Sequence, residues 1–281
     1  MTTTLKLWFS AIARTFANPG ALLVFAISYA FLLVASYIFI SIHEATVWQV
    51  LVTYALMILI PIGFFTLQAA IINRAMDQKF RWRLILIDTL KFLIVVIPVL
   101  LVVWLLYFLL NRVSARYPAP AVELFTTKQT AKPTTPPLHW PSLIFGTLRF
   151  VLWGVAFPLA TIHLWIAIAG GGFRTPFRDG AKSFFKRIGS ALARAFSPDS
   201  VLIYGLGLII FFVLPYVIMV PIFSIKGNKM EFTVFGLRLL LSFLFSLTGW
   251  VLTLTTFARA VPDLPPEVSA PAVAQPTESA A

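Results

Sequence analysis

The sequence predicts an all-α membrane protein, a bundle of six transmembrane helices, and three observations carry that prediction. Hydrophobic residues make up 59% of the 281 residues and charged residues only 11%, whereas a soluble domain is about 25% charged. Six apolar stretches each approach or exceed the roughly 20 residues that a spanning helix needs. Lysines and arginines gather in alternate loops between these stretches. These features exclude a soluble enzyme, a disordered chain and a fibre.

The elements follow in order along the chain. Residues 1–20 are predicted to form a cytoplasmic amphipathic helix, because apolar residues recur there at helical spacing. A transmembrane domain follows over residues 21–260, and residues 261–281, rich in proline and alanine, are predicted to be a disordered cytoplasmic tail. The predicted spans are about 21–42, 47–72, 84–110, 143–169, 201–223 and 235–257. The first span is read as retained, because its apolar run exceeds the roughly 7–15 residues of a signal peptide.

An interfacial helix is predicted over about 176–196, before the fifth span. Thr175 is a suitable cap and Pro176 suits the first helical position. Aromatic and aliphatic residues then fall on one face, and most of the basic residues fall elsewhere. This pattern is typical of a helix that lies at the membrane surface, with its apolar face among acyl chains and its cations at headgroups.

A short internal repeat relates this helix to the N-terminal segment. Ser10–Phe16 reads SAIARTF and Ser190–Phe196 reads SALARAF, and each is followed by a proline turn and a span. A third basic segment, KFRWRLILIDTLKFL, precedes the third span. We therefore expect three parallel-repeat hairpins, each introduced by a basic amphipathic helix at the cytoplasmic surface.

The distribution of basic residues predicts the orientation. Fourteen of the 22 lysines and arginines lie on the side that holds both termini. The positive-inside rule therefore places both termini in the cytoplasm of a cell whose inner membrane the chain spans. The net charge of +12 therefore indicates binding to anionic membrane lipids and not to nucleic acid. The residues expected to contact lipid headgroups are Arg14, Arg178, Lys182, Lys186, Arg187 and Arg194.

Few polar residues remain inside the predicted spans. His163 lies on a seam of small residues in the fourth span, and Thr253 lies on a similar seam in the sixth. Because small residues let helices approach closely, the fourth and sixth spans are expected to pack through these seams. His163 then either forms a structural interhelical hydrogen bond or serves a proton-relay or ligand-binding role. Asp88 and Lys91, three residues apart, either neutralise each other near the headgroups or form a proton or ion site.

Catalytic and metal-binding motifs are missing from the sequence. There is no cysteine, no phosphate-binding glycine-rich loop, no G-x-S-x-G and no H-E-x-x-H. His43, Glu44 and His139 share the predicted outer side but lack ligand spacing. We therefore expect no enzyme activity, no cofactor and no metal site.

Two segments carry a resemblance to a known group. SAIARTFANPGALL and GAKSFFKRIGSALARAFSPDSVL each combine a basic amphipathic helix, a proline turn and a span. In this the chain resembles a broad group of bacterial six-helix membrane proteins, which includes the membrane domain fused to some glycerophosphodiester phosphodiesterases. The resemblance implies an architecture and not phosphodiesterase chemistry.

Two functions are compatible with these patterns. The first is a non-enzymatic integral membrane protein with a structural, scaffolding or envelope-related role, which contacts anionic lipid or a protein partner through basic helices. The alternative is a small transporter or channel that uses the intramembrane polar residues. A connected polar cavity would favour transport, and a closed bundle with a basic cytoplasmic face would favour the first function.

Overall fold

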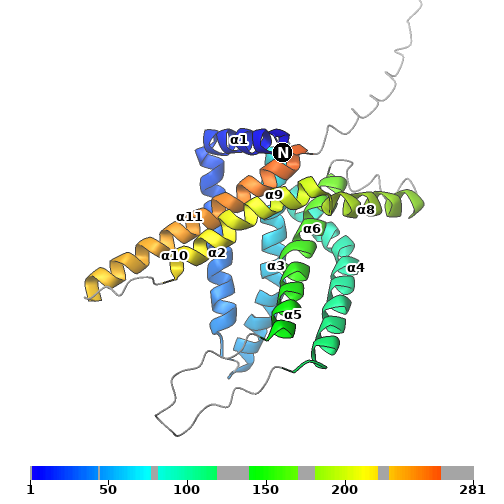
Figure 1. The fold of residues 1–281 in the computed structure, drawn as a ribbon. Helices are drawn as coiled ribbons and strands as arrows, with labels where there is room; N and C mark the ends of the chain where they lie inside the picture. The colour runs from blue at the N-terminus through cyan, green and yellow to red at the C-terminus, as the bar shows by residue number, and fades with distance from the viewer. Residues whose placement is uncertain are drawn as a thin grey trace, which may run out of the picture.

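The protein is a multi-pass membrane protein built from helices (Figure 1). The computed structural model describes residues 2–43, 45–76, 82–118, 139–169, 181–220 and 228–260. Within these ranges there are helices and turns but no strand, and six helices are long and apolar enough to cross a membrane. The predicted tail at 261–281 lies outside the described residues.

Each predicted span coincides with a helical stretch over the residues described, and residues 221–223 of the fifth span lie outside them. The helices are α1 (Thr2–Ala17), α2 (Pro19–Ser41), α3 (Val47–Ala75), α4 (Trp82–Ser114), α5 (Trp140–Phe150), α6 (Phe157–Ala169), α8 (Ala181–Ala195), α9 (Pro198–Leu208), α10 (Leu214–Met219) and α11 (Asn228–Ala260). The fourth span joins α5 to α6 through a π-helical segment, η1 (Val151–Ala156), and the fifth joins α9 to α10 through η2 (Ile209–Val213). Of the interfacial helix predicted over 176–196, the part from Ala181 is described and is helical.

Both π-helical segments end two residues before a proline, Pro158 or Pro215. Proline has no backbone N–H, so it interrupts the ladder of helical hydrogen bonds. In a membrane, freed backbone groups need partners from within the protein. Near Pro158 the Tyr204 hydroxyl from the fifth span donates to the Gly154 carbonyl at 2.7 Å. This bond links the fourth span to the fifth at the irregular turn.

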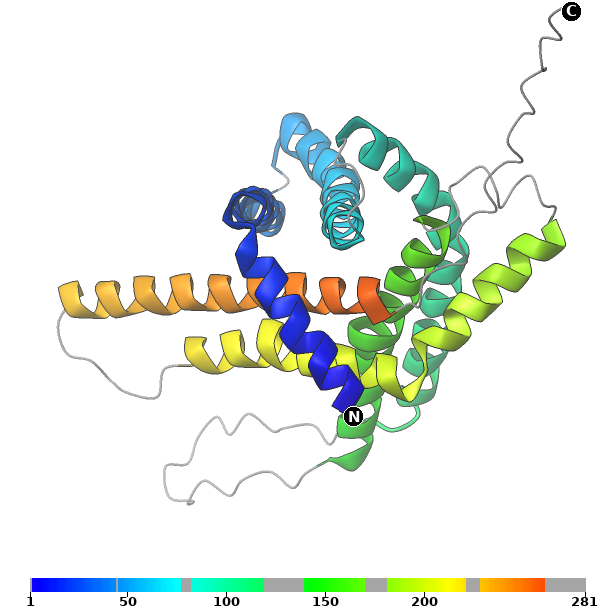
Figure 2. The ribbon, with the colours of Figure 1, turned by 90° about the horizontal axis from the view of Figure 1, so that it is seen from above.

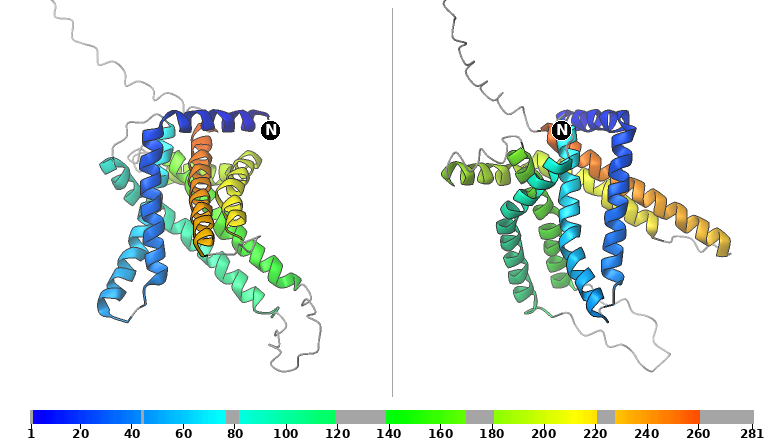
Figure 3. Two further views of the ribbon diagram at one scale, coloured as in Figure 1. Left: turned by 90° about the vertical axis from the view of Figure 1, so that its left-hand side faces the viewer. Right: turned by 180° about the vertical axis from the view of Figure 1, so that it is seen from behind.

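The helices cluster most tightly at one end of the bundle, which we call the α1 end. Helix α1 lies crosswise to α2 at this end, and α8 extends sideways from the bundle (Figures 1 and 3). Seen from above, α1 crosses over α11 and reaches the hairpin of the fifth and sixth spans (Figure 2). There Trp8 and Ala11 are buried with Leu252, and Ile12 packs beside them.

Helix α11 runs through the middle of the bundle and is strongly tilted relative to α2 and α3 (Figures 1 and 2). It contacts α1, α3, α6 and the whole fifth span. Most of its buried residues lie in its last turns, where Val251–Ala258 are all buried. In α3 the buried run is likewise the late stretch Leu67–Ile72, whereas Val47–Pro61 contains no buried residue. The core therefore sits near the α1 end, and the far halves of the spans present apolar side chains outward.

Two sequence expectations about the surface helices need correction. The third basic segment does not form a helix of its own, because from Trp82 onward it is continuous with the third span in α4. In α1 the predicted apolar face is divided. Trp8 and Ile12 pack on the bundle, whereas Phe9 and Phe16 are 70% and 55% exposed. The close crossing of α1 over α11 causes this division, since only one edge of α1 touches the protein.

Candidate functional site

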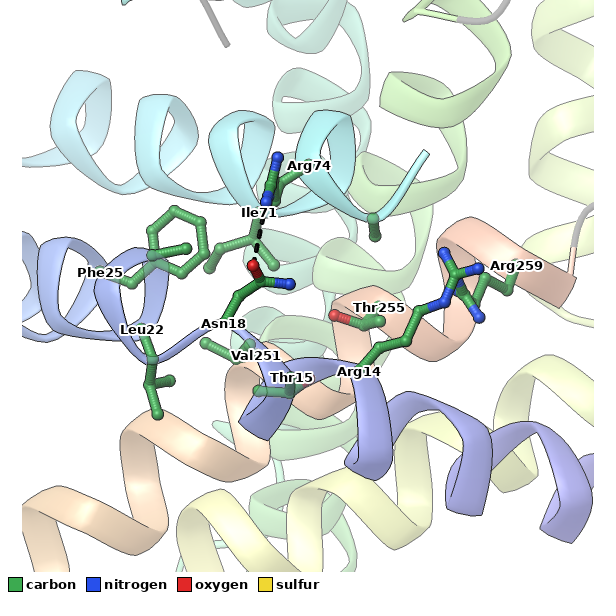
Figure 4. Close-up of a pocket in the computed structure, with 12 residues that line it drawn as sticks. Arg14, Thr15, Asn18, Leu22, Phe25, Ile71, Arg74, Val251, Thr255 and Arg259 are labelled. Atoms are coloured by element: carbon green, nitrogen blue, oxygen red, sulfur yellow. Dashed lines mark hydrogen bonds between the residues drawn. The ribbon is translucent and has the colours of Figure 1, made fainter. Parts of the chain in front are cut away.

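A pocket lined by three arginines and by apolar side chains opens at the α1 end, where four helices meet. Arg14 at the end of α1, Arg74 in the last turn of α3 and Arg259 in the last turn of α11 all line it. Asn18 lies in the turn between α1 and α2, and Thr255 adds a buried hydroxyl from α11. Figure 4 shows these side chains around the pocket, with Arg14 and Arg259 reaching toward the same side. Three cationic side chains from three helices thus share one cavity.

The turn between α1 and α2 explains why Asn18 faces the pocket. Asn18 precedes Pro19 and occupies the N-cap position of α2, where an asparagine side chain ordinarily accepts a bond from the helix backbone. Here its side chain makes no such bond. Its Oδ1 accepts instead from Arg74 Nη2 at 3.4 Å (Figure 4). The amide therefore ties the start of α2 to the end of α3 and holds the Arg74 guanidinium at the pocket edge.

The pocket is suited to an anion. Its cavity of about 70 Å³ is several times the roughly 10–15 Å³ that one water needs. Among the described residues that line it there is no aspartate or glutamate. Arg14 and Arg74 are exposed at its mouth, and Thr255 is buried at its inner side. Guanidinium groups present several donors in a planar fork, which matches the oxygens of phosphate or carboxylate.

Helix α8 supplies further cations at the same end. Lys182, Lys186 and Arg194 are exposed on it, and Phe185, also exposed, lies beside the lysines. The later turns of α8 are held by packing, since Ala191 and Ala195 are buried in the core. The side chain of Arg187 and the whole of Arg178 lie outside the described residues. Of the four expected lipid-contacting basic residues whose side chains the structure describes, Arg14 alone lines the pocket.

His163 is buried in the bundle and does not face outward. It is 7% exposed, and its ring packs edge-on against Phe257 of α11 at a centroid distance of 5.2 Å. Contact between the fourth and sixth spans is therefore confirmed. Within the described residues His163 Nε2 has no hydrogen-bond partner, so the expected interhelical hydrogen bond through this nitrogen is absent there.

The expected pairing of the two small-residue seams is wrong. Thr253 packs against Gly207 of the fifth span, and Gly249 faces the backbone of Phe211 there. The Thr253 hydroxyl donates to the Gly249 carbonyl in its own helix at 2.6 Å. Thr253, Gly249 and Ser242 of the α11 seam therefore face the fifth span, whereas Ser246 shares a hydrogen bond with Tyr29 of α2.

Asp88 and Lys91 form an ion pair with 3.7 Å between Asp88 Oδ1 and Lys91 Nζ. Both side chains are well exposed, at 38% and 50%. The pair lies on the outer surface of α4 and not in the core with His163. This arrangement fits mutual neutralisation near the headgroups. No group of three or more metal-ligating residues occurs in the part of the chain that the structure describes.

Three residues of the pocket escaped the sequence analysis as site residues. Arg74 and Arg259 counted only toward the charge bias, and Asn18 only as part of a proline turn. Arg74 and Arg259 each lie in the last turn of a span at the same end of the bundle. This shared position was the sequence feature that could have indicated a common site. The convergence of the three residues depends on how α1, α3 and α11 cross, and no pattern in the sequence specifies that crossing.

Comparisons with protein families, with curated proteins and with solved structures give no match for this chain.

Proposed function

We propose that this protein is a non-enzymatic inner-membrane protein with a structural or scaffolding role, which binds anionic lipid at the cytoplasmic surface. The observation that carries the proposal is the arginine pocket, where Arg14, Arg74 and Arg259 line one cavity. Its location supports a lipid ligand, since two of these arginines lie in the last turn of membrane-spanning helices. Headgroup phosphates occupy that level of a bilayer.

The positive-inside rule supports a cytoplasmic location for the α1 end. The basic residues of α1, α8 and the ends of α3 and α11 gather there, and such clusters are retained in the cytoplasm. Because the chain has no cysteine, single cysteines can be introduced without background labelling. A cysteine at Ser10 should resist a membrane-impermeant maleimide in intact cells, and one at Arg116 should react. Reversed labelling would refute the orientation.

We propose that α8 is an amphipathic surface helix that lies on anionic headgroups. Lys182 and Lys186 are exposed beside the exposed Phe185, so a cationic and an apolar group are offered together. A cationic residue near an anionic membrane surface contributes about 1 kcal/mol of binding. The repeat hairpins remain a prediction, supported by the shared position of α1 and α8, each just before a span at the α1 end.

The test follows the environment of α8 in nanodiscs. An environment-sensitive fluorophore on Phe185→Cys should shift toward an apolar signal as phosphatidylglycerol replaces phosphatidylcholine. Lys182→Gln with Lys186→Gln should weaken the shift, because the two attractive charges are gone. Arg112→Gln, at the far end of α4, is the matched control and should leave the shift unchanged. Fluorescence that does not change with the fraction of phosphatidylglycerol would overturn this proposal.

Transport is the second candidate function, and one observation favours it. His163 is buried in the membrane core beside Phe257, with Nε2 lacking a hydrogen-bond partner in the described chain. Ionisable groups at such positions often mark ion or proton pathways. Proton flux into proteoliposomes that His163→Phe abolishes would support transport. If the proton flux equals that of protein-free vesicles, the protein does not transport protons and His163 serves only in packing.

A further inference from the structure

We propose that the α1 end holds one anionic glycerophospholipid in a defined site, with its phosphate among Arg14, Arg74 and Arg259 and an acyl chain along α2. This inference rests on the proposed function and names the ligand of its pocket. It differs from general headgroup contact because the arginine pocket adjoins a second, apolar cavity. A phospholipid has the same two-part chemistry, a phosphate joined to hydrocarbon.

The second cavity shares residues with the first. It measures about 250 Å³ and is lined by Gly20, Ala21, Val24, Phe25 and Arg74. Ala21, Phe25 and Arg74 also line the arginine pocket, so the two cavities meet along α2. Gly20 lies at the start of that span and Val24 one turn further in. The apolar cavity therefore lies beside the arginine pocket along the first turns of α2, where hydrocarbon joined to a bound phosphate can pack.

The backbone at the start of α2 adds to the attraction for phosphate. The first N–H groups of a helix have no partner within the helix. Pro19 has no N–H, and the Asn18 side chain does not cap the helix. The amides of Gly20 and Ala21 therefore open α2 at the cavity edge, where a helix N-terminus favours an anion. Arg14, Arg74 and Arg259 line the neighbouring pocket, where they also offset the partial negative charge at the C-terminal ends of α1, α3 and α11.

The arginine pocket and the apolar cavity together should select an anionic phospholipid. A free phosphate ion satisfies the arginines but leaves the apolar cavity empty. A zwitterionic lipid fills the apolar cavity but carries a choline cation to a place where three guanidinium groups gather. An anionic phospholipid meets both requirements, so it should bind more tightly than phosphatidylcholine or inorganic phosphate.

The experiment titrates dioleoylphosphatidylglycerol into the detergent-purified full chain and counts bound lipids by native mass spectrometry. One lipid should bind with higher affinity than the rest. Arg14→Gln, Arg74→Gln and Arg259→Gln should each lower that first affinity about tenfold, the change expected from losing one charge-assisted bond to phosphate. Arg112→Gln should not. Arg14→Lys keeps the charge and should lose less than Arg14→Gln.

A second substitution separates a lipid from a soluble phosphate. Ala21 lies where the cavities meet, so Ala21→Phe should block the acyl path and lower phosphatidylglycerol binding with all three arginines present. Inorganic phosphate and glycerophosphate should compete only weakly. If they compete as well as the lipid, and Ala21→Phe has no effect, the site binds soluble phosphate and the lipid assignment is wrong.

Failure of the site is distinguishable from failure of the proposed function. If the three arginine variants bind the first lipid as Arg112→Gln does, the defined site does not exist. In that case the lipid-dependent fluorescence shift on α8 would still show whether the surface as a whole engages anionic lipid. Variants that do not remain monodisperse are replaced by Arg14→Lys and Ala21→Phe, which change volume or donor geometry with the charge retained.

Discussion

The Tyr204 hydroxyl stabilises the irregular turn of the fourth span by donating a hydrogen bond to its backbone. Tyr204→Phe removes the hydroxyl that donates to the Gly154 carbonyl, and leaves that acceptor without its partner in the membrane. The expected loss of unfolding free energy is about 1–2 kcal/mol. Unfolding in mixed detergent micelles measures it. Tyr216→Phe is the control, because Tyr216 is 66% exposed. Equal losses for the two variants would contradict the role given to Tyr204.

For single residues, the sequence predicted which side chains face the bundle better than it predicted which helix they contact. It identified His163 as facing the bundle, and His163 is buried against Phe257. It paired the Thr253 seam with the wrong neighbour, since a small residue marks a close approach without naming the helix that approaches. The partner depends on helix crossing, which only the assembled bundle determines.

Helices are the scale at which the sequence was most informative. Hydropathy located six spans because a bilayer imposes a minimum apolar length on any helix that crosses it. It did not indicate the π-helical segments η1 and η2, although Pro158 and Pro215 marked where the helical pattern would change. Nor did it separate the two edges of α1, because an apolar residue suits both a protein contact and a lipid contact.

The attachment of α1 to the bundle depends on Trp8. Trp8 is 6% exposed and packs with Leu252 of α11. Trp8→Ala should release α1 and raise the rate of trypsin cleavage after Lys6 and Arg14 in detergent. Phe9→Ala, on the same helix but 70% exposed, should leave the rate unchanged. Slow cleavage in both variants would show that other contacts hold α1.

The molecule as a whole is packed at the α1 end and open at the other. Leu254 of α11 is fully buried, whereas Leu240 in the same helix is 54% exposed. Leu254→Ala should cost about 2–5 kcal/mol of unfolding free energy, and Leu240→Ala much less. The measurement is unfolding in mixed micelles. Similar costs at both positions would contradict the uneven packing.

The end of the molecule that carries the cations could be predicted from the sequence, but the cavity that the arginines share could not. Charge bias predicted which end carries the cations, because translocation sorts them by side. It did not predict that Arg14, Arg74 and Arg259 share one cavity. That arrangement requires α1 to lie across the bundle and α11 to tilt through its middle (Figure 2), and both features arise from tertiary packing.

The central claim is that anionic lipid binds the α1 end. Its most direct test compares hydrogen exchange of the full chain in phosphatidylglycerol and phosphatidylcholine nanodiscs. We predict slower exchange in the anionic discs at α1, at the first turns of α2 and at α8, with the far end of α4 unchanged. Identical exchange at the α1 end in both lipids, or protection confined to the far end, would contradict the account.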